Sequence, residues 1–498
     1  MTTTNSQDKR LFASALVLLT ILGLLAIWYP RFPPMQDYPQ SLFMAHVLSS
    51  FADPALNWSE HYAANQHLGP YSLFFVIVGL FAKVVPVEIA GKLFISLALC
   101  LTAFLALAWN RAHAPDHPAW SALLLFPLLF SQVYYMGFVN YLISIPVLFL
   151  ALLVHEKFIR HDRKPGTIIS YLALLLLLLL AHPYTILVFL ILSFVITLFS
   201  SDSGKKIPIG LIGPIAIAIL FVLWYLSTFG VSPSQGLDTV RIRWWPLRDV
   251  AGYFSLPFVG MRITNGPDLL TLLAWSIIAA LFLVAGIHQK QPLPFRSPVF
   301  IMLLLSLAGY AILPFWLGDY SYFNLRMSIV CYFLLALALG NIRLGRWSRY
   351  ALVILVCSIM LMTLRTHLAL SAETEELLPL FDRMKQNATV GCVDIGASPA
   401  AIDRHYFYQF HTHDHFYYHV VVGGGAAATL FDSKMNPIRV KEGIAMPDIF
   451  RAPQFYQYIL VRGRLPWEQL FANTHRTVAQ SGSWRLYERY NPLRNAAE

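Results

Sequence analysis

Long apolar segments separated by short polar ones constrain this chain more than any other feature. A helix of about 20 apolar residues crosses the hydrocarbon core of a bilayer, and a shorter one crosses with local thinning. Hydrophobic residues make up 57% of the sequence and charged residues only 12%. This composition excludes a soluble globular protein and predicts an all-α polytopic membrane bundle of about eleven transmembrane helices. The predicted spans are 11–29, 92–109, 119–134, 137–154, 168–181, 183–200, 207–229, 269–287, 298–317, 326–340 and 350–370.

Lysines and arginines decide whether the shorter apolar stretch 71–85 is a further span. If this stretch stays on the outer surface, every strongly basic loop falls on the cytoplasmic side, as the positive-inside rule requires. These loops are 110–118, 155–166, 201–208, 288–298 and 341–349. If 71–85 crossed the membrane, all of them would face outward. The sequence therefore predicts an inner (plasma) membrane protein with a cytoplasmic N-terminus and interfacial helices in the first outer loop. The net charge of +10 comes mostly from these loops. We expect them to contact membrane lipids rather than nucleic acid.

The apolar pattern stops near residue 370, which divides the chain into two predicted domains. Residues 1–370 form the bundle, with long outer loops at 30–91 and 230–268. Residues 371–498 are expected to form a small extracytoplasmic (periplasmic) domain of the α/β or α+β class. Within it, the glycines 423–425 mark a change of element, and the alternating patterns at 456–461 and 484–487 predict strands.

Asp37 is the first carboxylate after the first apolar span, and it opens a helix predicted over 37–52. Asp is a favoured residue at a helix N-cap, so a purely structural role is one interpretation. A carboxylate at the membrane surface can also accept a proton or hold a cation. Taken alone, this residue leaves both interpretations open.

Several arginines on the predicted outer side are candidates for binding a lipid phosphate. A guanidinium group binds phosphate through two parallel hydrogen bonds, and Trp244 and Trp245 would seat the segment at headgroup depth. The alternatives are simple interfacial anchoring or snorkelling of a long side chain to the membrane surface. The phosphate-binding candidates are Arg241, Arg243, Arg248, Arg262 and Arg326.

Polar residues at the outer ends of the predicted helices are substrate-pocket candidates because they share one side of the membrane. Each of them can alternatively be satisfied by contacts inside the bundle. The pocket candidates are Tyr38, His46, Asn140, Tyr141, His182, Asp319, Tyr320 and Asn324.

The metal candidates are His411, His413 and His415, which would share one face of a strand. Their aromatic neighbours instead favour a half-buried sheet or a surface for glycan or lipid. The chain lacks the common nucleotide-binding and hydrolase motifs.

The whole arrangement resembles the GT-C superfamily of membrane glycosyltransferases. The shared features are the cytoplasmic tail, the first span, an outer loop with an early acidic residue, helices before the second span and an outer C-terminal domain. Segments 35–39, 137–141 and 458–463 look like those of uncharacterised bacterial relatives. The resemblance implies a sugar carried on a polyprenyl phosphate or diphosphate and a glycan, lipid or protein acceptor. It places the family's acidic residue at Asp37. Gln36 stands where many relatives carry a second carboxylate, so no cofactor is assigned and a divalent metal stays open.

The chemistry implied by this resemblance is an inverting transfer. Asp37 would accept a proton from the acceptor hydroxyl, or orient it, while the arginines stabilise the departing lipid phosphate. Two alternatives stay open. A transporter or flippase for a lipid-linked saccharide would need polar groups on both membrane faces, and a noncatalytic assembly protein would act through its outer domain.

Overall fold

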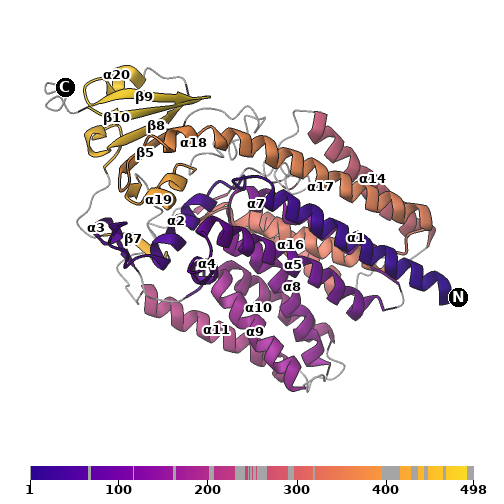
Figure 1. Ribbon diagram of the computed structural model, residues 1–498. Coiled ribbons are helices and arrows are strands. Elements are labelled where there is room, and N and C mark those ends of the chain that lie inside the picture. Colours follow the sequence, from indigo (N-terminus) through magenta and orange to yellow (C-terminus); the bar gives the residue numbers. More distant parts are fainter. Residues whose placement is uncertain are drawn as a thin grey trace.

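The computed structural model shows a helical bundle that carries a β-rich C-terminal region at one end (Figure 1). The structure describes residues 2–64, 69–115, 117–160, 164–200, 207–229, 242–244, 246, 250, 254, 266–289, 297–317, 320–394, 415–427, 436–441, 447–463 and 467–490.

Among these described residues, seven helical segments are long and apolar enough to cross a membrane, and four shorter apolar ones accompany them. Together they occupy the positions of the predicted apolar runs. The long helices are α1 (Thr2–Trp28), α5 (Val87–His113), α8 (Val139–Ile159), α11 (Ile207–Phe229), α14 (Gly266–His288), α16 (Phe323–Ala338) and α17 (Arg346–Glu375). The shorter ones are α9 (Pro165–Ala181), α10 (Pro183–Ser200), α15 (Pro298–Ile312) and the broken segment η1–α6–α7 (Trp120–Leu124, Leu125–Leu129, Gln132–Tyr135).

Burial separates the central helices from the peripheral ones. α8 and α16 are enclosed by other helices, whereas α11 and α14 expose rows of leucine and isoleucine side chains. Exposed apolar rows of this extent are stable only against lipid tails, because a water-facing surface would not keep them. The described helices therefore form an integral membrane protein with α8 and α16 at its core.

The segment between α1 and α5, predicted as the first outer loop, folds into the end of the bundle. Its helices are α2 (Tyr38–Ser49), α3 (Trp58–His61) and α4 (Leu73–Phe81). α4 has only nine residues, far fewer than the about 20 that a span needs. We expected an interfacial helix here, but almost every residue of α2 is buried. The interfacial position of α2 stays a prediction, but its apolar side chains face α4, α5 and the C-terminal helix α19 (Tyr417–Gly423).

The C-terminal region contains a mixed five-stranded sheet in the order β6-β5-β8-β10-β9. β5 runs parallel to β6 and β8, and β10 runs antiparallel to β8 and β9. The strands are β5 (Thr389–Asp394), β6 (Ala426–Ala427), β8 (Tyr458–Arg462), β9 (His475–Ser481) and β10 (Trp484–Arg489). The short helices are α18 (Leu378–Phe381), α19 (Tyr417–Gly423) and α20 (Trp467–Phe471), with the 3₁₀ turn η5 (Pro453–Phe455). Both predicted strands are confirmed, as β8 and β10, and Gly423 ends α19 as predicted.

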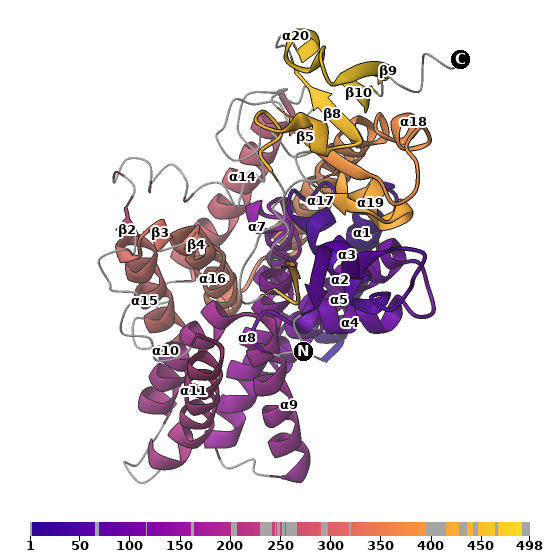
Figure 2. The ribbon, with the colours of Figure 1, turned by 90° about the vertical axis from the view of Figure 1, so that its left-hand side faces the viewer.

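Several contacts among the described residues attach this region to the rest of the chain, and three of them fix its position. Strand β7 (Ile438–Val440) pairs antiparallel with β1 (Tyr62–Ala64) of the first outer loop. Helix α19 packs on α2, where Gln40 donates a hydrogen bond to the Tyr417 hydroxyl at 3.1 Å. The last turn of α17 reaches the sheet, where Glu376 accepts hydrogen bonds from Ser483. The sheet therefore sits directly over the end of the bundle that holds the first outer loop (Figure 2).

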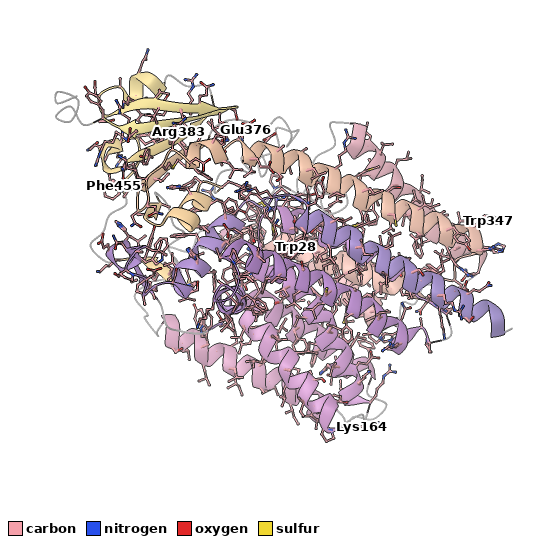
Figure 3. The ribbon with its side chains drawn as sticks, in the orientation of Figure 1. Trp28, Lys164, Trp347, Glu376, Arg383 and Phe455 are labelled. Carbon is pink, nitrogen blue, oxygen red and sulfur yellow. The ribbon has the colours of Figure 1, made fainter. Side chains whose placement is uncertain are left out.

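The two ends of the bundle differ in what they carry. Glu376 lies beside the sheet, whereas Lys164 and Trp347 lie at the opposite end of the bundle (Figure 3). The N-terminus lies at that opposite end as well (Figure 1).

Candidate functional site

The segment that carries Asp37 is held in place by the backbone of the turn that follows α7. The Gln36 amide donates to the Tyr135 carbonyl at 2.8 Å, and the Asp37 amide donates to the Met136 carbonyl at 3.1 Å. Gly137 completes this contact with a φ of +80°, a conformation that favours glycine. A Cβ atom at Gly137 would lie 2.7 Å from the Asp37 nitrogen. The position of Asp37 therefore depends on a glycine in a distant part of the sequence.

The side chain of Asp37 does not cap the helix that it precedes. Asp37 has φ −87° and ψ −1°, in the helical region rather than the extended region typical of an N-cap. It makes no side-chain capping hydrogen bond, and only its backbone carbonyl accepts from Ser41, at 3.1 Å. The structural interpretation of Asp37 as a simple cap is therefore not supported.

The electrostatic surroundings of Asp37 suit proton exchange near neutral pH. Asp37 keeps some accessible surface, but protein surrounds most of the side chain. Burial raises the pKa of Asp37 to about 7, and the nearby positive charge of Arg326 acts in the opposite direction. A carboxylic acid with this pKa is present in both protonation states at physiological pH, as a general base requires.

Aromatic rings surround Arg326 in the first turn of α16. Its guanidinium carbon lies 4.7 Å from the ring centroid of Phe138 and 5.9 Å from those of Tyr141 and Phe323. The Tyr141 hydroxyl also donates to the Arg326 carbonyl at 2.5 Å. Aromatic faces attract a guanidinium through their negative π-surface and restrict its rotation. Arg326 is thus a pre-positioned cation at the end of the bundle that carries Asp37.

A small cavity of about 10 Å³, measured as the space open to the centre of a water molecule, lies next to Arg326. Most of its wall is apolar, and the lining residues with polar side chains are Gln132, Tyr322, Arg326 and Ser328. The lining residues are Gln132, Val133, Met136, Phe138, Tyr322, Leu325, Arg326, Ser328 and Ile329. Met136, whose carbonyl accepts from the Asp37 amide, also lines the cavity, so the cavity and the Asp37 segment share the turn that follows α7.

A small sheet brings one arginine of segment 230–268, the predicted long outer loop, to this region. Strand β2 (Ile242–Arg243) pairs with β3 (Trp316–Leu317), which pairs with β4 (Tyr320–Ser321) just before α16. The Arg243 carbonyl accepts from the Phe315 amide at 2.9 Å, and the Arg243 side chain is exposed. Of the predicted site residues, Arg241, Arg248, Arg262, Asp319, His411 and His413 lie outside the described residues.

Two of the predicted pocket residues help to shape the walls near Arg326. The Asn140 side chain accepts from the Phe74 amide and donates to the Tyr71 carbonyl, both at 2.8 Å, and so fixes the start of α4. His182 accepts from the Tyr184 amide at 3.1 Å, and its ring packs edge-on against Tyr71 and Tyr141. Both therefore order the backbone and the aromatic rings around the site.

The remaining predicted pocket residues are spread more widely. Tyr38 begins α2, and its hydroxyl lies against Gly91 of α5. His46 packs on Trp58 at 5.8 Å, further along α2. Asn324 is buried and accepts from the Leu325 amide at 2.9 Å, while Tyr320 lies in β4.

The sequence assigned no metal, and the three histidines that were the candidates for one stay untested. His415 is buried beside the ring of Tyr418, and the other two histidines fall outside the described part of the chain. Within the described residues, no group of three or more His, Cys, Asp or Glu side chains is arranged to hold a metal ion.

Sequence reasoning missed two buried residues that support the Asp37 segment. Lys92 donates to the Pro30 carbonyl at 2.7 Å and to the Trp28 carbonyl at 3.3 Å, at the end of α1. His367 of α17 contacts the Ala26 carbonyl through Nδ1 at 2.8 Å, and its ring stacks on Tyr134. An ionisable residue inside an apolar run is the sequence signal that could have indicated both.

Comparison with known proteins identifies the fold. No protein-family model matches the sequence, and no curated protein matches it. Among solved structures, the crystal structure of ArnT from Cupriavidus metallidurans bound to undecaprenyl phosphate is similar, with a TM-score of 0.57 and 12% sequence identity. The similarity covers 97% of this chain and 98% of that one. The chain is therefore an integral membrane protein with a GT-C-like fold.

Proposed function

We propose that this protein is a membrane glycosyltransferase that moves a sugar from a polyprenyl-phosphate donor to an acceptor hydroxyl, with inversion at the anomeric carbon. The observation that carries the proposal is the Asp37 carboxylate, which caps no helix, titrates near pH 7 and is influenced by the charge of Arg326. The similar structure of ArnT was solved with undecaprenyl phosphate bound, which supports a polyprenyl phosphate as the lipid carrier.

Arg326 is the proposed binding group for the lipid phosphate. Its guanidinium is held by aromatic rings, so little side-chain freedom is lost when an anion binds. The apolar wall of the adjacent cavity suits the first isoprenyl units, and Arg243 on the small sheet provides a second, exposed cation nearby. A cation in this position stabilises the negative charge that grows on the leaving phosphate.

Asp37 is the proposed general base. The acceptor hydroxyl transfers its proton to the Asp37 carboxylate as its oxygen forms a bond to the anomeric carbon. The bond from that carbon to the phosphate oxygen breaks at the same time, and its electron pair leaves with the lipid phosphate. Because a phosphate departs as an anion, the reaction needs no second carboxylic acid to protonate it.

The proposed topology places this site on the extracytoplasmic face. We propose eleven spans with a cytoplasmic N-terminus, because the basic loops obey the positive-inside rule in that orientation. Lys164 lies in one of these loops, at the end of the bundle opposite the C-terminal sheet (Figure 3). Asn140, Tyr141 and His182 are proposed to position Arg326 and α4, and Asn324 to order the start of α16.

A transfer assay tests the proposal. Purified full-length protein in proteoliposomes receives polyprenyl phosphate carrying a radiolabelled hexose, and both sugar release to acceptors and movement of the lipid between leaflets are measured. We expect transfer by the wild type and a loss of at least about 100-fold in Asp37→Asn, because general base catalysis contributes about 10²–10⁴-fold.

Asp53→Asn is the matched control, since Asp53 is an exposed carboxylate in the same outer loop. It should retain wild-type activity. Full transfer by folded Asp37→Asn would refute Asp37 as the base. Movement of the lipid without sugar transfer would favour a flippase, and neither activity would favour an assembly protein.

A further inference from the structure

Three tyrosine hydroxyls near the Asp37 segment are buried but make no hydrogen bond among the described residues. Tyr38 comes from α2, Tyr134 from α7 and Tyr418 from α19, and each side chain is at most 2% exposed. None of the three hydroxyl oxygens has a hydrogen-bond partner among the described residues. A buried hydroxyl without a partner costs about 1–3 kcal/mol, so such groups require an explanation. We call Tyr38, Tyr134 and Tyr418 the tyrosine cluster.

Each ring of the tyrosine cluster is fixed by its own contacts. Tyr134 stacks on His367 at a centroid distance of 5.1 Å, and Tyr418 packs on Phe32 at 4.3 Å. The Tyr38 hydroxyl lies so close to Gly91 that a Cβ atom there would be 2.1 Å away. Because the rings are held, their hydroxyls are pre-oriented rather than free to seek partners elsewhere.

The negative charge of Glu88 acts on two of the three hydroxyls, those of Tyr38 and Tyr418. Burial raises the pKa of Tyr38, and the negative charge of Glu88 raises it further. Burial likewise raises the pKa of Tyr418, with added contributions from Tyr38, Glu88 and Tyr134. The backbone geometry places two of these rings at the Asp37 segment: the Gln36 amide donates to the carbonyl of Tyr135, the neighbour of Tyr134, and Tyr418 packs on Phe32. Gln36, which precedes Asp37, adds a buried side-chain oxygen that has no partner in the described part of the chain.

We propose that the tyrosine cluster, with Glu88 and Gln36, is a subsite for the hydroxyl groups of a saccharide beside Asp37. A tyrosine hydroxyl both donates and accepts, and a carboxylate accepts two or more hydrogen bonds, which matches the alternating donors and acceptors of a sugar ring. Gln36, Asp37 and Glu88 keep partial exposure, whereas the three tyrosines are buried. This inference rests on the proposed transferase function and names the ligand class that its site must hold.

The subsite gives the C-terminal region a direct part in binding. Tyr418 belongs to α19, which is fixed on α2 by the hydrogen bond from Gln40 to Tyr417 and by the packing of Phe43 on Tyr417 at 5.3 Å. A residue nearly four hundred positions away from Tyr38 therefore completes the same hydroxyl cluster. The C-terminal region is a component of the binding site rather than a separate appendage.

Binding measurements on the full-length protein in lipid nanodiscs test the subsite. The probes are a polyprenyl phosphate without sugar and the same lipid carrying one hexose, each labelled for equilibrium binding. The variants Tyr38→Phe, Tyr134→Phe and Tyr418→Phe each remove one oxygen and keep the ring, and Glu88→Gln weakens the acceptor. We expect each Phe variant to bind the hexose-bearing lipid about 5- to 30-fold more weakly and to bind the bare lipid like the wild type.

Tyr487→Phe is the matched control, because the Tyr487 hydroxyl in β10 is equally buried and has no partner among the described residues. It should change neither affinity. Melting temperatures accompany each measurement, and the Phe variants should be at least as stable as the wild type, since removing an unsatisfied hydroxyl is not costly.

A second arm separates the two possible sources of the saccharide. Methyl glucoside is added to protein saturated with bare lipid, and its contact is followed by saturation-transfer NMR. Loss of the glucoside signal in the Phe variants, with hexose-lipid affinity unchanged, assigns the subsite to the acceptor sugar. The opposite pattern assigns it to the donor sugar.

If the wild type discriminates the two lipids and the Phe variants match it in both arms, the cluster holds only water and the subsite is refuted. If the wild type binds neither lipid, the proposed function itself fails and the subsite falls with it.

Discussion

The two sides of Asp37 are built from different chemistry. On one side, Arg326 sits among aromatic rings beside a largely apolar cavity. On the other, the tyrosine cluster and Glu88 offer hydroxyl and carboxylate oxygens. A cation enclosed by π-faces selects an anion, whereas uncharged hydroxyls near a carboxylate select neutral, hydroxyl-bearing groups. The difference suggests how a single carboxylate can serve a sugar phosphate, with the phosphate and the saccharide recognised by separate surfaces.

Both sides depend on the same backbone contact, so its disruption should have the largest effect. Gly137→Ala places a Cβ 2.6 Å from the Tyr38 nitrogen and 2.7 Å from the Asp37 nitrogen, in a conformation with φ +80°. We expect transfer to fall more than about 100-fold, because misplaced reacting groups lose rate steeply. Binding of the bare and the hexose-bearing lipid should weaken together. Gly166→Ala is the control, since nothing lies within 4 Å of the added Cβ.

Substitutions at Arg326 should separate the two sides. Arg326→Ala removes the aromatic-held cation, and we expect about 10- to 100-fold weaker binding of the bare lipid, a range typical for a charged hydrogen-bonding group. Arg326→Lys keeps the charge but loses the planar fork, so its affinity should be intermediate. The difference in affinity between bare and hexose-bearing lipid should stay as in the wild type.

Arg243→Ala is the variant with which Arg326→Ala is compared for binding of the lipid phosphate. Arg243 is exposed, and exposed charges contribute little, so we expect less than about 5-fold weaker binding. Equal losses at Arg243 and Arg326 would contradict the assignment of Arg326 as the main phosphate group. The tyrosine variants should instead weaken binding of the hexose-bearing lipid and leave binding of the bare lipid unchanged. If every variant weakened binding of both lipids equally, the two sides would not be distinct.

The sequence predicted the helices and strands of this fold better than the tertiary contacts between them. Apolar runs located the helices because lipid burial demands long apolar segments, and alternation located β8 and β10. Asp37 and Arg326 stood out because a charge beside an apolar run is costly. Burial of α2 was not predictable, since α19 covers it from a distant part of the chain.

The tyrosine cluster escaped prediction for the same reason. Tyr134 and Tyr418 carry no local motif, and an aromatic residue near a membrane helix end is ordinarily an interfacial anchor. Only tertiary packing brings their hydroxyls to Tyr38 and Glu88. The hydrogen bonds from Lys92 to the carbonyls at the end of α1 are likewise tertiary contacts that no local sequence motif indicates.

The pH dependence of single-turnover transfer tests Asp37 most directly. Burial raises the pKa of Asp37 to about 7, so the carboxylate is protonated, and inactive as a base, below that pH. We predict that the transfer rate with bound donor rises with pH through about 7 and levels off above it, while donor affinity changes little. In Asp37→Asn, the remaining slow transfer should lose this rise.

The same raised pKa has a consequence for stability. The contribution of Asp37 is most favourable at acidic pH and is lost as pH rises through about 7, because ionising a buried carboxylate is costly. At pH 8 folded Asp37→Asn should therefore melt at or above the wild-type temperature, which excludes unfolding as the cause of lost activity. A wild-type rate that is independent of pH between 5 and 9, or the same rise in Asp37→Asn, would contradict the assignment of Asp37 as the base.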